Sequence, residues 1–401
     1  MNWSAISPRF QSAGRYAAIA LGASIPISVA LDNVLFLLVL LAWLAGGGLR
    51  QKLAALRANP AALAALAFFA LIVLGMTWSP PGSWREGWYY VSKYKDLVLV
   101  AALAGLVAGA RDKRLALTAF LAAMTLTLVL SYALWLDLLP VRLPNRIPEN
   151  PFVFKLQITH GVLMALAAFL AAARALRATQ RLWRFIYTAG ASLAAFNVLF
   201  MVEGRTGYLV LGVLALYLGI AHGRWRGGLV AAAAIAATLG AAQLANAPMF
   251  GRVTLIETEL QEWDAGRAGE TSTGLRMNYY KITASIVRDH PILGVGTGGF
   301  ISAYREKMRG TALPESNNPH NQYLLTAAQL GALGVLALLA MFLVMWWQAG
   351  RLEADTRLAA CGLVLTIAAG CLLNSFLIDH VEGLLFAWMA GVLFAAPGRT
   401  A

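Results

Sequence analysis

Three basic side chains in this sequence, Arg205, Arg276 and His320, have the right types to transfer a group from a phosphate-linked donor. An arginine side chain is a planar fork of donors that fits two phosphate oxygens at once. An imidazole can accept a proton near neutral pH. Two arginines near a bilayer surface are what a lipid-linked diphosphate would require. The question is therefore which elements bring these residues together.

His320 precedes an apolar segment in the stretch NNPHNQYLLTAAQLGALG, residues 317–334. Asn318 suits a helix N-cap and Pro319 suits the first helical position, which predicts His320 in the first turn. The positive end of the helix dipole would then favour a neutral ring. Small residues on the same predicted face would let another helix pack closely. That face comprises Leu324, Ala327, Gly331 and Gly334.

Each of the three residues also has a structural interpretation. Arg205 could pair with Glu203 or extend its charge to the interface, and Arg276 could be a solvated loop charge. His320 could simply form a hydrogen bond at the membrane surface. If all three residues lie on the same side of the membrane, their proximity favours a functional site over three separate structural roles. Further candidates for substrate binding are Tyr280, Asn321, Arg142, Arg146, Lys155 and Lys281.

The sequence gives no support for a metal or cofactor site. No histidine pair has metal-ligand spacing, and no close carboxylate pair stands on the side that carries the candidates, so we expect neither metal nor cofactor. The glycine-rich run GVGTGGF, residues 294–300, lacks the strand and acidic residue of a dinucleotide site and predicts a tight turn. His380 is a weaker candidate at a helix end.

The composition is that of a membrane protein. The chain has 401 residues, of which 59% are hydrophobic and 13% charged. Long apolar runs recur throughout and predict an all-α polytopic membrane protein forming one integral domain over residues 1–401. Twelve spans are expected, near 16–31, 34–47, 61–77, 94–110, 115–137, 158–173, 184–202, 206–221, 228–246, 321–348, 357–376 and 383–397.

Charge distribution predicts the orientation. The net charge of +13 reflects lysines and arginines in alternate connections, which mark the cytoplasmic side and require no nucleic acid partner. Both termini fall on that side. The longest connection, residues 247–320 between the ninth and tenth spans, then faces outward. Within it, LRMNYYKITASIVRDHP predicts a helix with Arg276, Tyr280, Thr283 and Val287 on one face.

These motifs resemble those of bacterial O-antigen ligases, in the superfamily that also holds O-antigen polymerases and protein O-oligosaccharyltransferases. His320-Asn321 followed by Gly331-x-x-Gly334 resembles the ligase signature. The segment from Arg276 to GVGTGGF resembles the shared outer loop, and Arg205-x-x-x-Leu209 the upstream arginine motif. The specific similarity covers about residues 200–335. Tyr279 and Tyr280 stand where the superfamily often has tryptophan.

The resemblance implies an inverting, metal-independent glycosyltransferase of the membrane-embedded GT-C type. The donor would be a glycan on undecaprenyl diphosphate, and the acceptor a sugar hydroxyl of lipid A–core oligosaccharide. The site would face the periplasm from the inner membrane of a Gram-negative bacterium, in contact with membrane lipid. Arg205 and Arg276 would bind the diphosphate, and His320 would act as general base or position the acceptor.

Three other functions are compatible with the same residues. An O-antigen polymerase would use the same donor with a second lipid-linked glycan as acceptor, and a protein O-oligosaccharyltransferase would use a protein. A transporter of lipid-linked sugars belongs to a different class. It would need charged residues along a transmembrane path, and charges in the middle of the expected spans are scarce.

Overall fold

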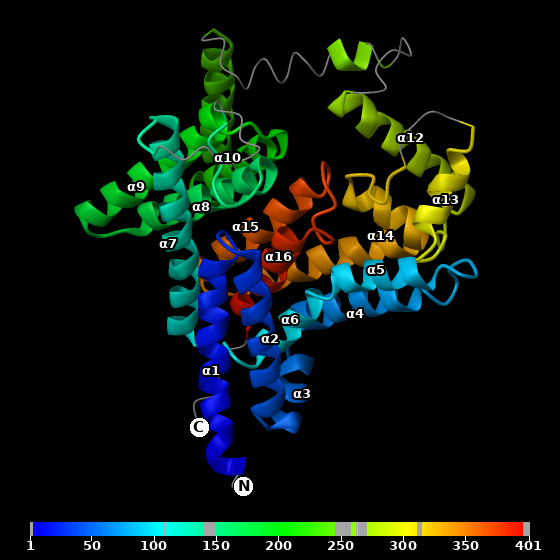
Figure 1. Ribbon diagram of the computed structural model, residues 1–401. Helices are drawn as coiled ribbons and strands as arrows, with labels where there is room; N and C mark the ends of the chain where they lie inside the picture. The colour runs from blue at the N-terminus through cyan, green and yellow to red at the C-terminus, as the bar shows by residue number, and fades with distance from the viewer. Residues whose placement is uncertain are drawn as a thin grey trace.

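A computed structural model describes residues 3–107, 109–139, 150–244, 258–261, 263, 271–310 and 315–395, and in these ranges every regular element is a helix (Figure 1). The elements are α1 (Trp3–Ser24), α2 (Val29–Ala45), α3 (Leu49–Arg57), α4 (Pro60–Leu74), α5 (Trp84–Tyr94), α6 (Leu97–Ala104), α7 (Ala110–Trp135), α8 (Gln157–Arg177), α9 (Arg181–Phe196), the π-helical η1 (Asn197–Met201), α10 (Arg205–Leu244), α12 (Ser272–Asp289), α13 (Phe300–Lys307), α14 (Gln322–Ala349), α15 (Ala354–Gly370) and α16 (His380–Leu393).

The predicted class, an all-helical polytopic membrane protein, agrees with this architecture. Five helices in the described residues are long and apolar enough to cross a membrane, and a sixth span exists if α2 and α3, bent by 114°, are counted together. The helices α4 and α16 are apolar but shorter. All twelve expected segments contain helix, but the count of twelve spans stays a prediction.

Several expected boundaries differ from the structure; α1, for example, ends at Ser24, inside the segment expected at 16–31. The segment expected at 94–110 is divided, because α5 ends at Tyr94 and α6 begins at Leu97. The segments expected at 206–221 and 228–246 form one element, α10, with a break at Arg224, whose φ is 55°. A Cβ on Gly219 would meet the carbonyl oxygen of Gly227 at 2.5 Å. The chain therefore turns back on itself at Arg224, with two glycines in backbone contact.

The centre of the bundle is α16, which packs against α1, α6 and α15 (Figure 1). Residues Val381 to Leu393 of this helix are all buried. The indole of Trp388 is fully buried and donates from Nε1 to the carbonyl of Ala18 on α1 at 2.7 Å. A buried indole that keeps its hydrogen bond fixes the position of α16 without a polar penalty. The helix therefore anchors the end of the bundle at which His380 lies.

The helix α14 is interrupted at Gly331, where φ is +61°. The backbone of the segment after α12 enters the break: the amides of Ala332 and Leu333 donate to the carbonyls of Pro291 and Ile292 at 2.8 and 3.2 Å. In the other direction, the amide of Val295 donates to Ala328 at 2.9 Å. The expectation that another helix packs closely against Gly331 is therefore wrong, because the loop after α12 packs against Gly331 instead.

The run 294–300 forms the predicted tight turn, with Gly294 and Gly296 at φ of +65° and +82°. Its core is Thr297, which is fully buried and donates from Oγ1 to Ile72 of α4 at 2.6 Å. Gln329 of α14 donates to the carbonyl of Thr297 at 3.0 Å. The turn thus ties α4 and α14 to the segment that follows α12, which fixes α12 over the end of α14.

We predict that Gly331→Ala destabilises the protein by about 1–3 kcal/mol. A Cβ at Gly331 would lie 2.2 Å from the backbone carbon and oxygen of Ile292, in a left-handed conformation that disfavours any side chain. Thermal unfolding in detergent measures the effect. Gly212→Ala in α10 is the matched control, because a Cβ there meets nothing within 4 Å. Equal melting temperatures for both variants would contradict the prediction.

Candidate functional site

The three candidate residues come from three elements and meet at one end of the bundle. Arg205 is the first residue of α10, Arg276 lies in α12, and His320 stands two positions before α14 begins. Arg276 is near enough to both others that its charge lowers the pKa of His320, while the charge of Arg205 lowers the pKa of Arg276. The structure therefore brings all three together, at what we term the His320 end.

Arg205 is held by contacts across the long connection. Its Nη1 donates to Oγ1 of the buried Thr273 at 2.8 Å, and its Nη2 lies 3.6 Å from Oε2 of Glu259. The sequence does not indicate either partner, because each is more than 50 residues away along the chain. The two contacts orient the guanidinium at the start of α10.

Arg276 differs from Arg205 in having no carboxylate partner among the described residues. It is half-buried, and burial is the main reason that its pKa is lowered, with the charge of Arg205 adding to the effect. Tyr280 lies one turn further along α12 and interacts with it. Two neighbouring cations, one of them unpaired, raise the energy of an empty site. An anion bound between them would relieve this cost.

The backbone of His320 is in the left-handed region, with φ at 54°. Its amide donates to Oδ1 of Asn318 at 2.8 Å, and the same oxygen accepts from Ser375 Oγ at 2.7 Å. A non-glycine residue in this conformation is strained and persists only where its surroundings impose it. Asn318 and Ser375 provide that constraint, so the ring is aimed by a tight turn.

The expected capping of α14 is wrong by three residues. The N-cap is Asn321, whose Oδ1 accepts from the amide of Leu324 at 3.0 Å and whose Nδ2 donates to Leu372 at 2.8 Å. His320 therefore precedes the helix, and Asn318 orders the turn before it. The proposed substrate contact of Asn321 competes with this capping role.

The His320 ring packs beside Tyr279, with ring centres 5.9 Å apart and planes inclined by 32°. The hydroxyl of Tyr280 donates to the backbone carbonyl of His320 at 3.3 Å. Burial and, second, the charge of Arg276 lower the pKa of the imidazole. The ring is therefore neutral as expected, but the cause is burial and the charge of Arg276 and not the helix dipole. A neutral imidazole beside an arginine can accept a proton.

A second layer of aromatic residues supports this end. Tyr90 and Tyr94 of α5 are fully buried: Tyr90 donates to the carbonyl of Asn317 at 2.6 Å, and Gln322 donates to Tyr94 at 2.7 Å. Trp84 and Trp88 on the same helix are exposed. The aromatic residues between Trp78 and Tyr94 predict, by composition alone, a belt at the membrane interface, and this interpretation misses the role of Tyr90 and Tyr94. The sequence signal is the spacing of the aromatic residues, because Tyr90 and Tyr94 share one helix face while Trp84 and Trp88 share another.

The weaker candidates are distributed differently. Arg142 and Arg146 lie outside the described residues. Lys281 is exposed on α12, with its ammonium 5.8 Å from the centre of the Trp263 ring. Its role in substrate binding stays a prediction.

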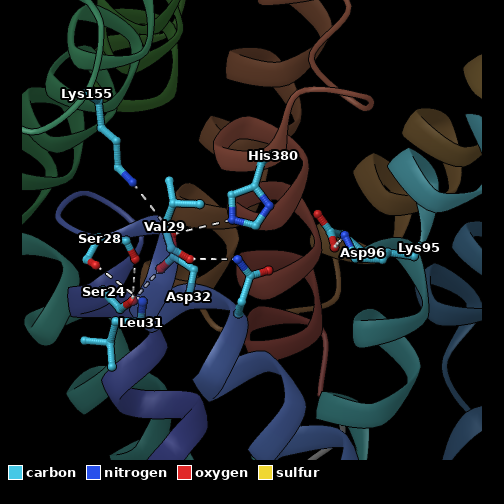
Figure 2. Close-up of polar contacts among 10 residues, drawn as sticks. Ser24, Ser28, Val29, Leu31, Asp32, Lys95, Asp96, Lys155 and His380 are labelled. Atoms are coloured by element: carbon cyan, nitrogen blue, oxygen red, sulfur yellow. Dashed lines mark hydrogen bonds and ion pairs between the residues drawn. The ribbon is translucent and has the colours of Figure 1, made fainter. Parts of the chain in front are cut away.

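Lys155 lies in a separate buried cluster (Figure 2). Its Nζ is 3.7 Å from Oδ2 of Asp32, which is fully buried at the start of α2. Nε2 of His380 approaches the same oxygen at 3.8 Å, and Ser24 donates to the carboxylate. Since the lysine side chain is only 6% exposed and has an acidic neighbour, these contacts favour a structural ion pair over the substrate contact expected from the sequence.

We predict that Lys155→Met destabilises the protein by about 3–5 kcal/mol, because it leaves the Asp32 carboxylate buried without its cation. Asp32→Asn combined with Lys155→Met should recover part of this loss, since both charges are then absent. Thermal unfolding of the two single variants and the double variant in detergent gives the coupling. Strictly additive losses would show that the pair is not coupled.

A cavity of about 560 Å³ lies at the opposite end of α15 from His320. It is lined at the start of α7, the end of α8 and the start of α15 by residues that include Lys113, Arg174 and Asp355. Its position among basic residues at the side expected to face the cytoplasm separates it from all three candidate residues. The candidate site is therefore defined by side-chain chemistry and not by cavity size.

Fold and site together define a polytopic helical membrane protein with a half-buried cationic site next to a histidine. A sequence model of the O-antigen ligase family matches residues 190–339, a range that contains Arg205, Arg276 and His320. This match supports a relationship of the segment to the O-antigen ligase and polymerase superfamily. A search of curated proteins found no match.

Proposed function

We propose that this protein is an O-antigen ligase that transfers a glycan from undecaprenyl diphosphate to a sugar hydroxyl of lipid A–core oligosaccharide. The reaction inverts the anomeric centre, needs no metal and takes place at the periplasmic face of the inner membrane of a Gram-negative bacterium. The observation that carries the proposal is the guanidinium of Arg276, which is half-buried, unpaired among the described residues and adjacent to both Arg205 and His320.

In this mechanism the arginines replace a metal. Their guanidinium groups bind the diphosphate oxygens and offset the negative charge that grows as the bond from phosphate to the anomeric carbon breaks. His320 accepts the proton of the acceptor hydroxyl while the hydroxyl oxygen forms the new bond to the anomeric carbon. The electron pair leaves with the diphosphate. A single displacement inverts the configuration, so no carboxylate nucleophile is required.

The alternatives within the superfamily share the same donor chemistry. A polymerase would lengthen one lipid-linked glycan with another, and a protein O-oligosaccharyltransferase would modify a hydroxyl of a protein. Both would use Arg205, Arg276 and His320 in the same roles. The acceptor therefore distinguishes these functions, and the resemblance of His320-Asn321 and Gly331-x-x-Gly334 to the ligase signature favours the ligase.

Reconstitution tests the proposal. Purified protein in detergent is supplied with lipid-linked O-antigen and lipid A–core in the presence of a chelator. Joined O-antigen and lipid A–core is the expected product. Lengthening of the donor glycan without lipid A–core would identify a polymerase. A transporter would form no joined product in detergent and would act only by moving lipid-linked sugar across a sealed membrane. That outcome would overturn the proposal.

A further inference from the structure

A cavity of about 390 Å³ lies beside α13, directly before His320 in the chain. It is lined by Ile301 and Tyr304 from α13 and by Glu315, Ser316 and Asn317 from the segment that leads to His320. The volume is within the range of small-molecule sites, about 300–1,000 Å³. Its lining residues combine an apolar side chain and a phenol with a carboxylate, a hydroxyl and an amide, and include no cation.

The phenol of Tyr304 has an unused hydrogen-bonding group. Its side chain is 1% exposed, and its hydroxyl has no hydrogen-bond partner in the described residues. Leaving such a group buried and unsatisfied costs about 1–3 kcal/mol. Burial also raises the pKa of Tyr304, so the hydroxyl keeps its proton. Because Tyr304 lines the cavity while its hydroxyl is enclosed, a ligand can accept this hydrogen bond after a small shift of the side chains that cover the hydroxyl.

Both walls of the cavity are held in place. The Tyr304 ring contacts Phe300 and Tyr279, with ring centres 5.7 and 6.4 Å apart. On the other wall, the backbone carbonyl of Asn317 accepts from Tyr90, and its Nδ2 donates to the hydroxyl of Tyr89 at 3.2 Å. Tyr304 is therefore positioned by ring packing, and Asn317 by two hydrogen bonds to the tyrosines of α5.

The cavity and the arginines are connected to His320 through different residues of α12. Tyr279 contacts both the His320 ring and the Tyr304 ring, so a single aromatic ring links the cavity wall to the imidazole. Arg276 and Tyr280 share a stripe of α12, and Tyr279 lies about 100° from Tyr280 around the helix axis. In an inverting displacement, the acceptor attacks the anomeric carbon from the side opposite to the departing diphosphate, so acceptor and donor need separate binding places.

We propose that this cavity binds an uncharged sugar ring of the acceptor, and that the Tyr304 hydroxyl is a specificity-determining hydrogen-bond donor to it. The inference rests on the proposed function, since it takes the diphosphate to lie at Arg205 and Arg276. Sugar hydroxyls donate to the Glu315 carboxylate and Asn317 amide oxygen, and accept from Tyr304. The charge of Glu315 is balanced by Arg305, whose Nε donates to Oε1 at 3.0 Å, so the polar groups of the cavity suit an uncharged ligand.

Tyr304→Phe tests the proposal because it removes one oxygen and keeps the ring. We expect KM for lipid A–core to rise about three- to tenfold, with KM for the lipid-linked donor and kcat unchanged. Thermal stability should stay constant or increase, because an unsatisfied buried group is removed. Tyr16→Phe removes the same atom from a residue that is 63% exposed and should leave both KM values unchanged.

Two other kinetic results would overturn the inference. A rise in KM for the donor alone would assign the cavity to the donor glycan, and unchanged KM values for both substrates would show that Tyr304 contacts neither. A fall in thermal stability that accounts for lost activity would show a structural role.

Binding provides a readout that does not depend on turnover. Soluble core oligosaccharide, freed of lipid A, is titrated calorimetrically against wild type and Tyr304→Phe. Weaker binding to the variant, with equal binding of undecaprenyl diphosphate, supports the inference, and equal binding of the oligosaccharide overturns it. If wild type forms no joined product but shows this difference, the proposed function fails while the sugar site stands.

Discussion

Replacing His320 with alanine is expected to lower kcat of glycan transfer about 10²–10⁴-fold, the usual contribution of a positioned acid or base. Donor binding should be little changed, because the arginines remain. The ring is a suitable base because burial and Arg276 lower its pKa, which keeps it unprotonated at neutral pH. Product formation under saturating donor measures the loss. A His320→Ala variant with wild-type kcat would contradict the base assignment.

The dependence of transfer on pH gives an independent measure of the same group. Only the neutral imidazole accepts a proton, so the rate should hold above the pKa of His320 and fall as pH decreases through it. Because that pKa lies below the ordinary value of 6.5, the plateau should extend to more acidic pH than an ordinary histidine allows. His290→Ala, at an exposed position after α12, is the matched control and should change neither kcat nor the profile.

The helical class and the meeting of the cationic residues were predictable because each rests on local sequence. Apolar runs predict helices, and the charge pattern places Arg205, Arg276 and His320 on one side. The break in α14 was not predictable in this way. It depends on carbonyls of Pro291 and Ile292, some 40 residues earlier, which take the amides that Gly331 releases. From the sequence alone, a glycine at position 331 is equally consistent with a helix-packing position and with a helix break.

The turn at His320 likewise could not be predicted from local sequence, because a tertiary contact decides its conformation. The order Asn-Pro-His-Asn offers two asparagines as caps, and helix propensity alone favours Asn318 followed by Pro319. Ser375, which comes from the segment between α15 and α16, binds Asn318 and assigns it to the turn. Asn321 is then left to cap α14. Tertiary contact therefore decides between two locally acceptable caps, and with them the conformation of the proposed base.

Arg276→Gln is expected to lower kcat/KM for the donor about 10²–10³-fold, comparable to the loss of one donor from an oxyanion hole. The guanidinium has no carboxylate partner in the described residues, so its removal leaves no buried acid behind. Arg205→Gln is less informative, because it also abandons Glu259, whose side chain is 17% exposed. Loss of activity there would mix catalysis with folding.

Arg276→Lys separates charge from geometry. A lysine keeps the positive charge but lacks the planar fork, so it should restore only part of kcat/KM if the diphosphate is bound through two oxygens. Arg288→Gln removes an arginine from the same helix at a side chain that is 80% exposed, and should leave kcat/KM unchanged. Full activity of Arg276→Lys would show that the site uses a point charge, and equal losses in the Arg276→Gln and Arg288→Gln variants would show only a general effect of net charge. A graded order, with wild type above lysine and lysine above glutamine, is the outcome that assigns Arg276 to the leaving diphosphate.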